Sequence, residues 1–328
     1  MTGKLSLLKR LNGVKLSTDN FSEKIEKLCD QHLNLEKDNI LLHPLSDSAK
    51  KRITQQEKIF SKMRLVKKKE LLAEKLFEEG YSFAMNKKFA EAIPSFSKAL
   101  HIQPKFSAAY YKRGLAREKE GDLEGALADF DQTLRFQPNF PQAHMARGIA
   151  FSRQGDFKKA IKDFSQALQM QSDLAEAYYH RGNARGARGD IPGAIRDYDE
   201  ALRIKPGYAA AYNHRGIEYY NQGNFKEAIS NFNQALRIEP NFADAYINRG
   251  LTHSTWGNIS DAIANFMQAI HLDPDIEASY YHLAKALERN EENKAALSNY
   301  QKYLYFSKGV QYGNQESAKE AIQQLRKK

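Results

Sequence analysis

Residues 175–208 read AEAYYHRGNARGARGDIPGAIRDYDEALRIKPGY, and two kinds of residue in this stretch recur along the chain at one fixed spacing. Gly182 belongs to a series of glycines that stand 34 residues apart, and Pro206 belongs to a series of prolines on the same period. The glycines occupy positions 80, 114, 148, 182, 216 and 250, and the prolines occupy 104, 138, 206, 240 and 274. A period of this length is typical of a solenoid built from repeated structural units. With Ala73 as position 1 of the first repeat, the seven repeats are 73–106, 107–140, 141–174, 175–208, 209–242, 243–276 and 277–310.

Each repeat has the pattern of two antiparallel helices joined by a tight turn. In repeat 3, Ile161, Phe164 and Leu168 follow helical spacing after Gly155 and Asp156. A glycine can adopt the left-handed conformation that ends a helix, and an Asp or Asn after it can cap the next helix. The turn glycines are Gly121, Gly155, Gly189, Gly223 and Gly257, and the caps are Asp122, Asp156, Asp190, Asn224 and Asn258. A glycine inside a helix costs about 0.5–1 kcal/mol relative to alanine, so its return at position 8 predicts a close approach between helices.

The stretch RGNARGARGD at residues 181–190 has an unusual density of arginine and glycine. Outside this context it would be typical of an arginine-glycine segment that binds single-stranded RNA, or of an adhesion tripeptide. Here Gly182 is the position-8 glycine of repeat 4, and Gly189 with Asp190 forms its turn. The period therefore favours a structural role for Gly182 and for the pair of Gly189 and Asp190. The extra glycine, Gly186, predicts that the first helix of repeat 4 is the weakest in the array.

The period and the positional pattern of residues 73–310 resemble the tetratricopeptide repeat family. The resemblance implies an all-α, right-handed superhelical solenoid of seven helix-turn-helix units, whose first helices line a concave groove for partner segments. Repeat 7 departs from the pattern, with Ala284 in place of the glycine and Lys308 in place of the proline. In residues 311–328, Ser317 and Glu320 fit a capping box and predict a C-terminal capping helix at 317–326.

By the same resemblance, positions 5 and 9 of each repeat face the groove, and they are rich in aromatic and apolar residues in repeats 1–4. Such residues supply large contact areas in binding surfaces. We therefore predict a scaffold or adaptor that binds a peptide or a helical segment of a partner protein, although each side chain could instead be half-buried against neighbouring helices. The predicted groove residues are Phe77, Tyr81, Tyr111, Leu115, Met145, Ile149, Tyr179, Asn183, Asn213, Ile247 and Tyr281.

Two further patterns bear on the partner of this groove. Members of the family that grip the acidic C-terminal tail of a chaperone use Lys at position 5 and Asn at position 9 of one repeat. Asn183 fits, but Tyr179 stands where the lysine should be, so we do not expect this partner. The residues His180, His214, Asn248 and His282 recur at position 6, and Arg113, Arg147, Arg181, Arg215 and Arg249 recur at position 7.

The recurrence at positions 6 and 7 predicts structural roles for these residues and not metal binding or catalysis. Equivalent positions of packed helices should lie about 10 Å apart, whereas metal-bound imidazoles lie about 2 Å from one ion. We therefore expect no metal site at position 6, but a polar ladder able to hydrogen-bond a peptide backbone. For the arginines at position 7 we expect pairing with carboxylates of adjacent helices.

The sequence carries no clear catalytic motif. It lacks the patterns G-x-x-x-x-G-K-[ST], G-x-G-x-x-G and H-E-x-x-H, and its S-x-x-K, from Ser95 to Lys98, lacks the companion motifs of such enzymes. We predict that the protein is not an enzyme and uses no cofactor or metal. Cys29 is the only cysteine, and no run of apolar residues is long enough to cross a membrane. These features predict a cytoplasmic protein, and the absence of acidic residues before Asp19 leaves organelle targeting as an alternative.

The non-repeated region, residues 1–72, carries most of the net charge of +10. The spacing of Phe21, Ile25, Leu28, His32 and Leu35 predicts a short amphipathic helix, and a second helix is expected to run from about Ser48 into repeat 1. A basic patch within 50–69 comprises Lys50, Lys51, Arg52, Lys58, Lys62, Arg64, Lys67, Lys68 and Lys69. It favours a cap with Ile53, Phe60 and Met63 packed on the solenoid. The alternative is an adaptor for nucleic acid, an anionic membrane or an acidic protein.

Overall fold

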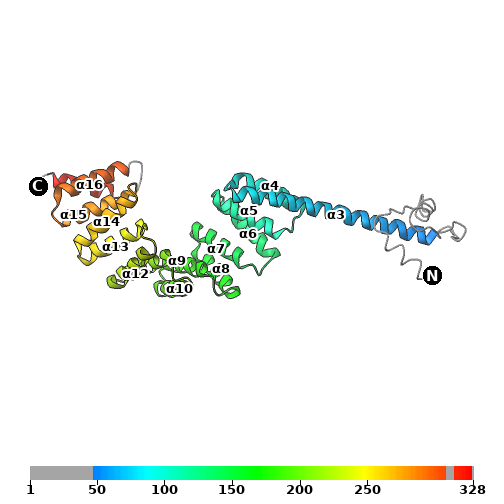
Figure 1. Cartoon of the computed structure of the whole chain (residues 1–328), viewed down its shortest axis with the longest axis horizontal. Coiled ribbons are helices and arrows are strands. Elements are labelled where there is room, and N and C mark those ends of the chain that lie inside the picture. Colours follow the sequence, from blue (N-terminus) through cyan, green and yellow to red (C-terminus); the bar gives the residue numbers. More distant parts are fainter. Residues whose placement is uncertain (1–46, 308–313, 327–328) are drawn as a thin grey trace, which may run out of the picture. The chain divides into compact units, whose positions relative to one another are not determined.

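The computed structural model describes residues 47–307 and 314–326, which are helical apart from short turns and contain no strand (Figure 1). The prediction of an all-α fold is therefore confirmed. The helices in chain order are α3 (Asp47–Met85), α4 (Phe89–Ile102), α5 (Ser107–Lys119), α6 (Leu123–Phe136), α7 (Pro141–Gln154), α8 (Phe157–Met170), α9 (Ala175–Ala187), α10 (Ile191–Ile204), α11 (Ala209–Asn221), α12 (Phe225–Ile238), α13 (Ala243–Trp256), α14 (Ile259–Leu272), α15 (Glu277–Arg289), α16 (Asn293–Phe306) and α17 (Gln315–Leu325).

The chain divides into two compact units, residues 1–79 with 98–104, and residues 80–97 with 105–328. In the first unit, α3 begins at Asp47, close to the start predicted from the sequence. Phe60 and Met63 are 59% and 53% exposed on this helix, and their packing against the solenoid stays a prediction. Three predictions fall outside the described residues. They concern the helix from Phe21 to Leu35, the targeting role of the first residues, and the packing of the Ile53 side chain.

The second compact unit is an α-solenoid in which each 34-residue period of the sequence from 107 onward forms one helix pair. Within a pair the helices are antiparallel, because Arg113 contacts Asp129 while Arg117, one turn later, contacts Gly125. Each second helix also packs on the first helix of the next repeat. The first helices α5, α7, α9, α11, α13 and α15 contact one another in succession. These helices, with the end of α3 that carries Tyr81, are called the first-helix surface below.

The glycine at position 8 lies where an aromatic ring of the second helix crosses the first helix. A Cβ atom on Gly148 would come within 2.7 Å of the buried Phe164 ring, which is closer than real Cβ contacts. The same encounter recurs at 2.7 to 2.9 Å for Gly80 with Phe96, Gly114 with Phe130, Gly182 with Tyr198, Gly216 with Phe232 and Gly250 with Phe266. The predicted close approach is confirmed, and its cause is the ring at position 24.

The turns between paired helices also follow the prediction, with one difference. Gly155 has φ +85° at the end of α7, and Asp156 caps α8 by accepting a hydrogen bond from the Lys159 backbone N–H. The other turn glycines likewise have positive φ. Asn224 and Asn258 occupy the N-cap positions of α12 and α14, but their side chains form no capping hydrogen bond.

The C-terminal helix α17 closes the apolar core of the last pair. Ile322 and Leu325 are buried in one cluster with residues of α15 and α16. The helix begins at Gln315 with Asn314 as N-cap, so Ser317 lies inside it, and the predicted capping box of Ser317 and Glu320 is wrong. The predicted C-terminal helix is confirmed, but it begins two residues earlier than expected.

Candidate functional site

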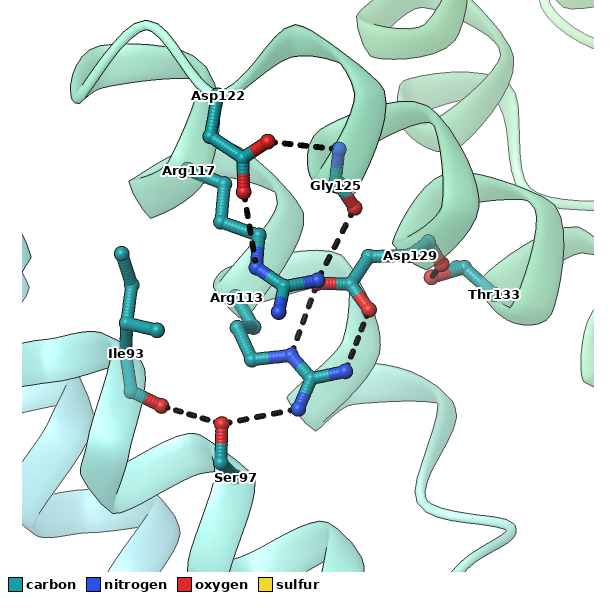
Figure 2. A network of polar contacts seen from close by, with 8 residues as sticks. All are labelled: Ile93, Ser97, Arg113, Arg117, Asp122, Gly125, Asp129 and Thr133. Atoms are coloured by element: carbon teal, nitrogen blue, oxygen red, sulfur yellow. Dashed lines mark hydrogen bonds and ion pairs between the residues drawn. The ribbon is translucent and has the colours of Figure 1, made fainter.

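The arginine at position 7 ties each helix pair to the preceding repeat. Arg113 on α5 donates two hydrogen bonds to Asp129 on α6, at 2.9 Å from Nε and 2.6 Å from Nη2 (Figure 2). Its Nη1 donates at 2.9 Å to Ser97 Oγ on α4, and Ser97 Oγ in turn donates to the carbonyl of Ile93. One guanidinium therefore fixes both the angle within a pair and the stacking between pairs.

This arrangement recurs through the second compact unit. The position-7 arginines and their hydrogen-bond partners are together called the arginine ladder below. The own-repeat and preceding-repeat partners are Asp163 and Asp131 for Arg147, Asp197 and Ser165 for Arg181, Asn231 and Asp199 for Arg215, and Asn265 and Asn233 for Arg249. The predicted pairing with carboxylates is confirmed for the first four arginines of the series, while Arg249 bonds two asparagines. The partners at position 23 were missed from the sequence, although their period of 34 residues would have revealed them.

The buried aspartates at position 23 each receive a second donor. Arg117 reaches Asp129 at 2.9 Å and Arg185 reaches Asp197 at 2.8 Å, whereas His144 Nδ1 lies 3.0 Å from Asp163. Burial alone would raise the pKa of Asp163, but hydrogen bonds from Arg147 and His144 hold this pKa below its usual value. The Asp163 carboxylate is therefore ionised, and all three carboxylates are paired, which suits a rigid scaffold for the first-helix surface.

The predicted groove residues differ in exposure. Tyr81 is exposed, and the half-buried members are Phe77, Tyr111, Leu115, Met145, Ile149, Tyr179, Asn183 and Ile247, of which Phe77 alone belongs to the first compact unit. Asn213 and Tyr281 are only 3% and 7% exposed, so the prediction that they line an open surface is wrong. Asn213 accepts a hydrogen bond from Asn248, and Tyr281 packs against Tyr303 of α16.

At its N-terminal end the first-helix surface is aromatic and carries a cation. The ammonium of Lys112 lies 5.0 Å from the Tyr81 ring and 5.8 Å from the Tyr111 ring. The Tyr111 ring packs at 4.9 Å on Phe140. Met145 and Ile149 follow on α7, half-buried beside the cluster of Ala160, Phe164 and Ala184. Each of these side chains therefore has one packed side and one side in solvent.

The middle of the first-helix surface is more polar. The Tyr179 ring meets His214 edge-on at 5.3 Å, and Tyr198 Oη donates to Asn183 Oδ1 at 2.8 Å. His214 Nδ1 lies 3.0 Å from the Ala210 carbonyl, so this nitrogen carries the proton of a neutral ring. Burial lowers the pKa of His214, which keeps the ring neutral at physiological pH.

The position-6 residues do not form the continuous polar ladder that we expected. His180 stacks on Phe164 and His282 stacks on Phe266, with ring centroids 5.8 and 5.7 Å apart. Burial lowers the pKa of both imidazoles. Within residues 47–307 and 314–326, no group of three or more His, Cys, Asp or Glu side chains is placed to hold a metal ion.

The basic patch lies on the part of α3 that precedes the repeats. Its cations are exposed at Lys51, Arg52, Lys58, Lys62, Arg64, Lys67, Lys68 and Lys69, and the Lys50 side chain lies outside the described residues. Ile59, Phe60, Met63 and Val66 on the same stretch are each at least half exposed. Among the described helices, none is long and apolar enough to cross a membrane.

Comparison with known proteins places the helix pairs in a recurrent fold. Models of the tetratricopeptide repeat match residues 77–144, 145–209 and 243–276, and a further model described as TPR repeat matches 216–255. A tetratricopeptide repeat protein from Parabacteroides merdae superposes with a TM-score of 0.62 at 21% identity, over 78% of this chain and 99% of that one. No curated protein matches the sequence.

Two other solved structures share the fold. The C-terminal part of a tetratricopeptide-repeat-containing protein from Cytophaga hutchinsonii has a TM-score of 0.56 at 16% identity, over 75% of this chain and 99% of that one. A chain of the APC/C hetero-tetramer Cut9–Hcn1 has a TM-score of 0.61 at 14% identity, over 94% of this chain and 53% of that one. At such identities the likeness concerns the fold alone.

Proposed function

Because the chain belongs to the tetratricopeptide repeat family, we propose that it is a scaffold or adaptor that binds a peptide or helical segment of a partner protein on its first-helix surface. The observation that carries this proposal is a set of partly exposed tyrosines in the second compact unit: Tyr81 near the end of α3, Tyr111 on α5 and Tyr179 on α9. Rigid aromatic side chains with one free face dominate the energetics of protein interfaces. The rigid arginine ladder beneath them limits the entropy lost on binding.

The proposed occupant is an extended or helical segment that is not the acidic tail of a chaperone. The surface from Tyr81 to Ile149 is mainly aromatic and apolar apart from Lys112, and the lysine needed to grip a terminal carboxylate is replaced by Tyr179. Carboxylate recognition depends on charge-assisted hydrogen bonds that this position cannot supply. Recognition is the proposed mechanism, and no chemical reaction is assigned to the surface.

The double variant Tyr111→Ala with Tyr179→Ala is expected to lose the partner. Each tyrosine removed from a binding hot spot costs about 2 kcal/mol or more, so the two together should lower affinity roughly 1000-fold. The measurement is capture from source lysate with mass spectrometry, followed by calorimetry on the purified partner. Met170→Ala with Met267→Ala is the matched control, because both methionines are exposed on second helices. Equal capture by wild-type protein and the tyrosine variant would contradict the proposal.

A second candidate function is binding of nucleic acid or an anionic membrane by the basic patch. It is favoured by the exposure of these cations on α3, beside Phe60 and Met63, which are 59% and 53% exposed. Binding to duplex DNA or to vesicles with anionic lipid should weaken by about 10³-fold or more between about 50 and 200 mM salt if six or more phosphates are contacted. Replacing Lys67, Lys68 and Lys69 with Glu should abolish it. Salt-independent binding, or binding unchanged in this variant, would exclude the patch as its cause.

A further inference from the structure

The described residues contain five carboxylates in side chains that are more than nine-tenths buried, and four of them are paired with arginine. Asp129, Asp163 and Asp197 belong to the arginine ladder. Glu118 on α5 pairs with Arg153 on α7, at 2.8 Å between Oε1 and Nη1. Buried charges in proteins are normally paired in this way because desolvation of a lone charge is costly.

Glu218 on α11 is the exception among the described residues. It is 8% exposed and has no ion pair there, and its only hydrogen bond is a long one from Asn221 Nδ2, at 3.4 Å. Burial raises the pKa of its carboxyl group above the usual value. Two arginines of α9, Arg181 and Arg185, are engaged elsewhere, because both bind Asp197. Among the residues that the structure describes, the Glu218 carboxylate therefore has no ion-pair partner.

The Glu218 carboxylate has space because the preceding repeat contains an extra glycine, Gly186. Position 10 holds alanine in Ala116, Ala150 and Ala184, and Glu218 is its charged replacement. Opposite it, Gly186 on α9 has no side chain, and a Cβ there would clash with Glu218 Oε1. Gly186 is partly exposed, and it has no side chain that could cover this oxygen. The extra glycine of RGNARGARGD thus places the carboxylate beside a partly exposed part of α9.

We propose that Glu218 is the receptor for a lysine or arginine side chain of the segment that binds the first-helix surface. The chain already shows such a pairing between two other successive first helices, α5 and α7, where Arg153 neutralises Glu118. A cation from the partner would compensate Glu218 in the same manner and fix the register of the segment next to Tyr179 and Asn183. This inference rests on the proposed function and adds the chemistry of one partner residue.

The test uses short random peptides displayed on phage and selected on the full chain. We expect the selected peptides to share one basic residue. Its replacement by glutamine should weaken binding to wild-type protein roughly tenfold or more, but should change binding to Glu218→Gln by less than about twofold. Glu118→Gln is the matched control and should retain the preference, because its carboxylate is already occupied by Arg153.

The outcomes separate the inference from the function on which it rests. Peptides that need Tyr111 and Tyr179 but show the same preference on Glu218→Gln would overturn the role of Glu218 and keep the first-helix surface. An empty selection, or peptides that ignore the two tyrosines, would overturn both.

Glu218→Gln should also fold, and this can be checked without a ligand. A carboxyl group whose pKa is raised on folding lowers the free energy of unfolding as pH rises above its unfolded pKa, near 4.5. At neutral pH the variant should therefore be more stable than wild-type protein, and the difference should close as pH falls toward 4.5. Urea unfolding at several pH values measures this, and a variant less stable at neutral pH would contradict the uncompensated state of Glu218.

Discussion

Replacement of Asp197 by alanine is expected to lower the free energy of unfolding by about 3–5 kcal/mol, because one partner of a buried ion pair is removed. Asp197 is 2% exposed. Its carboxylate accepts hydrogen bonds from Arg181 Nε and Nη2 and from Arg185 Nη1, at 2.7 to 2.9 Å. Alanine would leave two half-buried guanidinium groups without their acceptor. Urea unfolding followed by circular dichroism measures the loss, and hydrogen exchange should localise it to α9 and α10.

The chain supplies its own control for this prediction. In repeat 5 the same position is Asn231, which accepts from Arg215 Nε at 2.8 Å, and Tyr219 stands where repeat 4 has Arg185. Asp197→Asn with Arg185→Tyr should therefore recover most of the stability lost in Asp197→Ala, because one arginine can be satisfied by an amide oxygen. A loss below about 1 kcal/mol for Asp197→Ala, the usual limit for a surface ion pair, would show that the ladder does not hold the repeats together.

The fold could be predicted from the sequence because steric constraints repeat with it. Gly148 is required by the Phe164 ring and Gly155 by a left-handed turn, and both requirements return every 34 residues. A period constrains many positions at once, so the helix pairs and their order follow from a few residues. The ladder acceptors at position 23 follow the same period and could have been predicted with them.

The exposure of individual site residues could not be predicted from the period. Position 5 is half-buried at Tyr179 but buried at Tyr281, because Tyr281 also packs against Tyr303 of the last pair, where repeat 4 has Ala201. Such differences depend on neighbours that the repeat pattern does not specify. The start of α17 was misplaced for a similar reason, since a local capping motif at Ser317 was outweighed by a helix that begins at Gln315 and buries Ala318.

The unpaired Glu218 also escaped the positional pattern. Its signal was a pair of exceptions in adjacent repeats, the extra Gly186 and a carboxylate at a position held by alanine in repeats 2–4. From the sequence, Gly186 alone suggested only a weak helix. The structure gives α9 the same bounds within its repeat as α5 and α11, and it places Glu218 against the glycine. The predicted weakness of α9 stays a prediction.

Replacement of Phe164 by alanine is the second large effect that we expect, a loss of about 3–5 kcal/mol in the free energy of unfolding. The Phe164 ring is fully buried between α7 and α8, packed with Ala160 and Ala184 and stacked on His180 of the next repeat. Its removal leaves a cavity at the contact between two helix pairs, and helix packing alone cannot close it. Urea unfolding of the single variant gives the magnitude.

A cycle with Gly148 identifies the cause of this loss. Alone, Gly148→Ala should destabilise by about 1–3 kcal/mol through the clash of its Cβ with the ring, less about 0.5–1 kcal/mol gained from helix propensity. In the Phe164→Ala background the clash is gone, so the same change should be neutral or stabilising. The two substitutions should therefore be coupled by more than the roughly 0.5 kcal/mol expected of independent sites. Additive effects would mean that the ring does not require the glycine, and the recurrence of glycine at position 8 would then need another physical explanation.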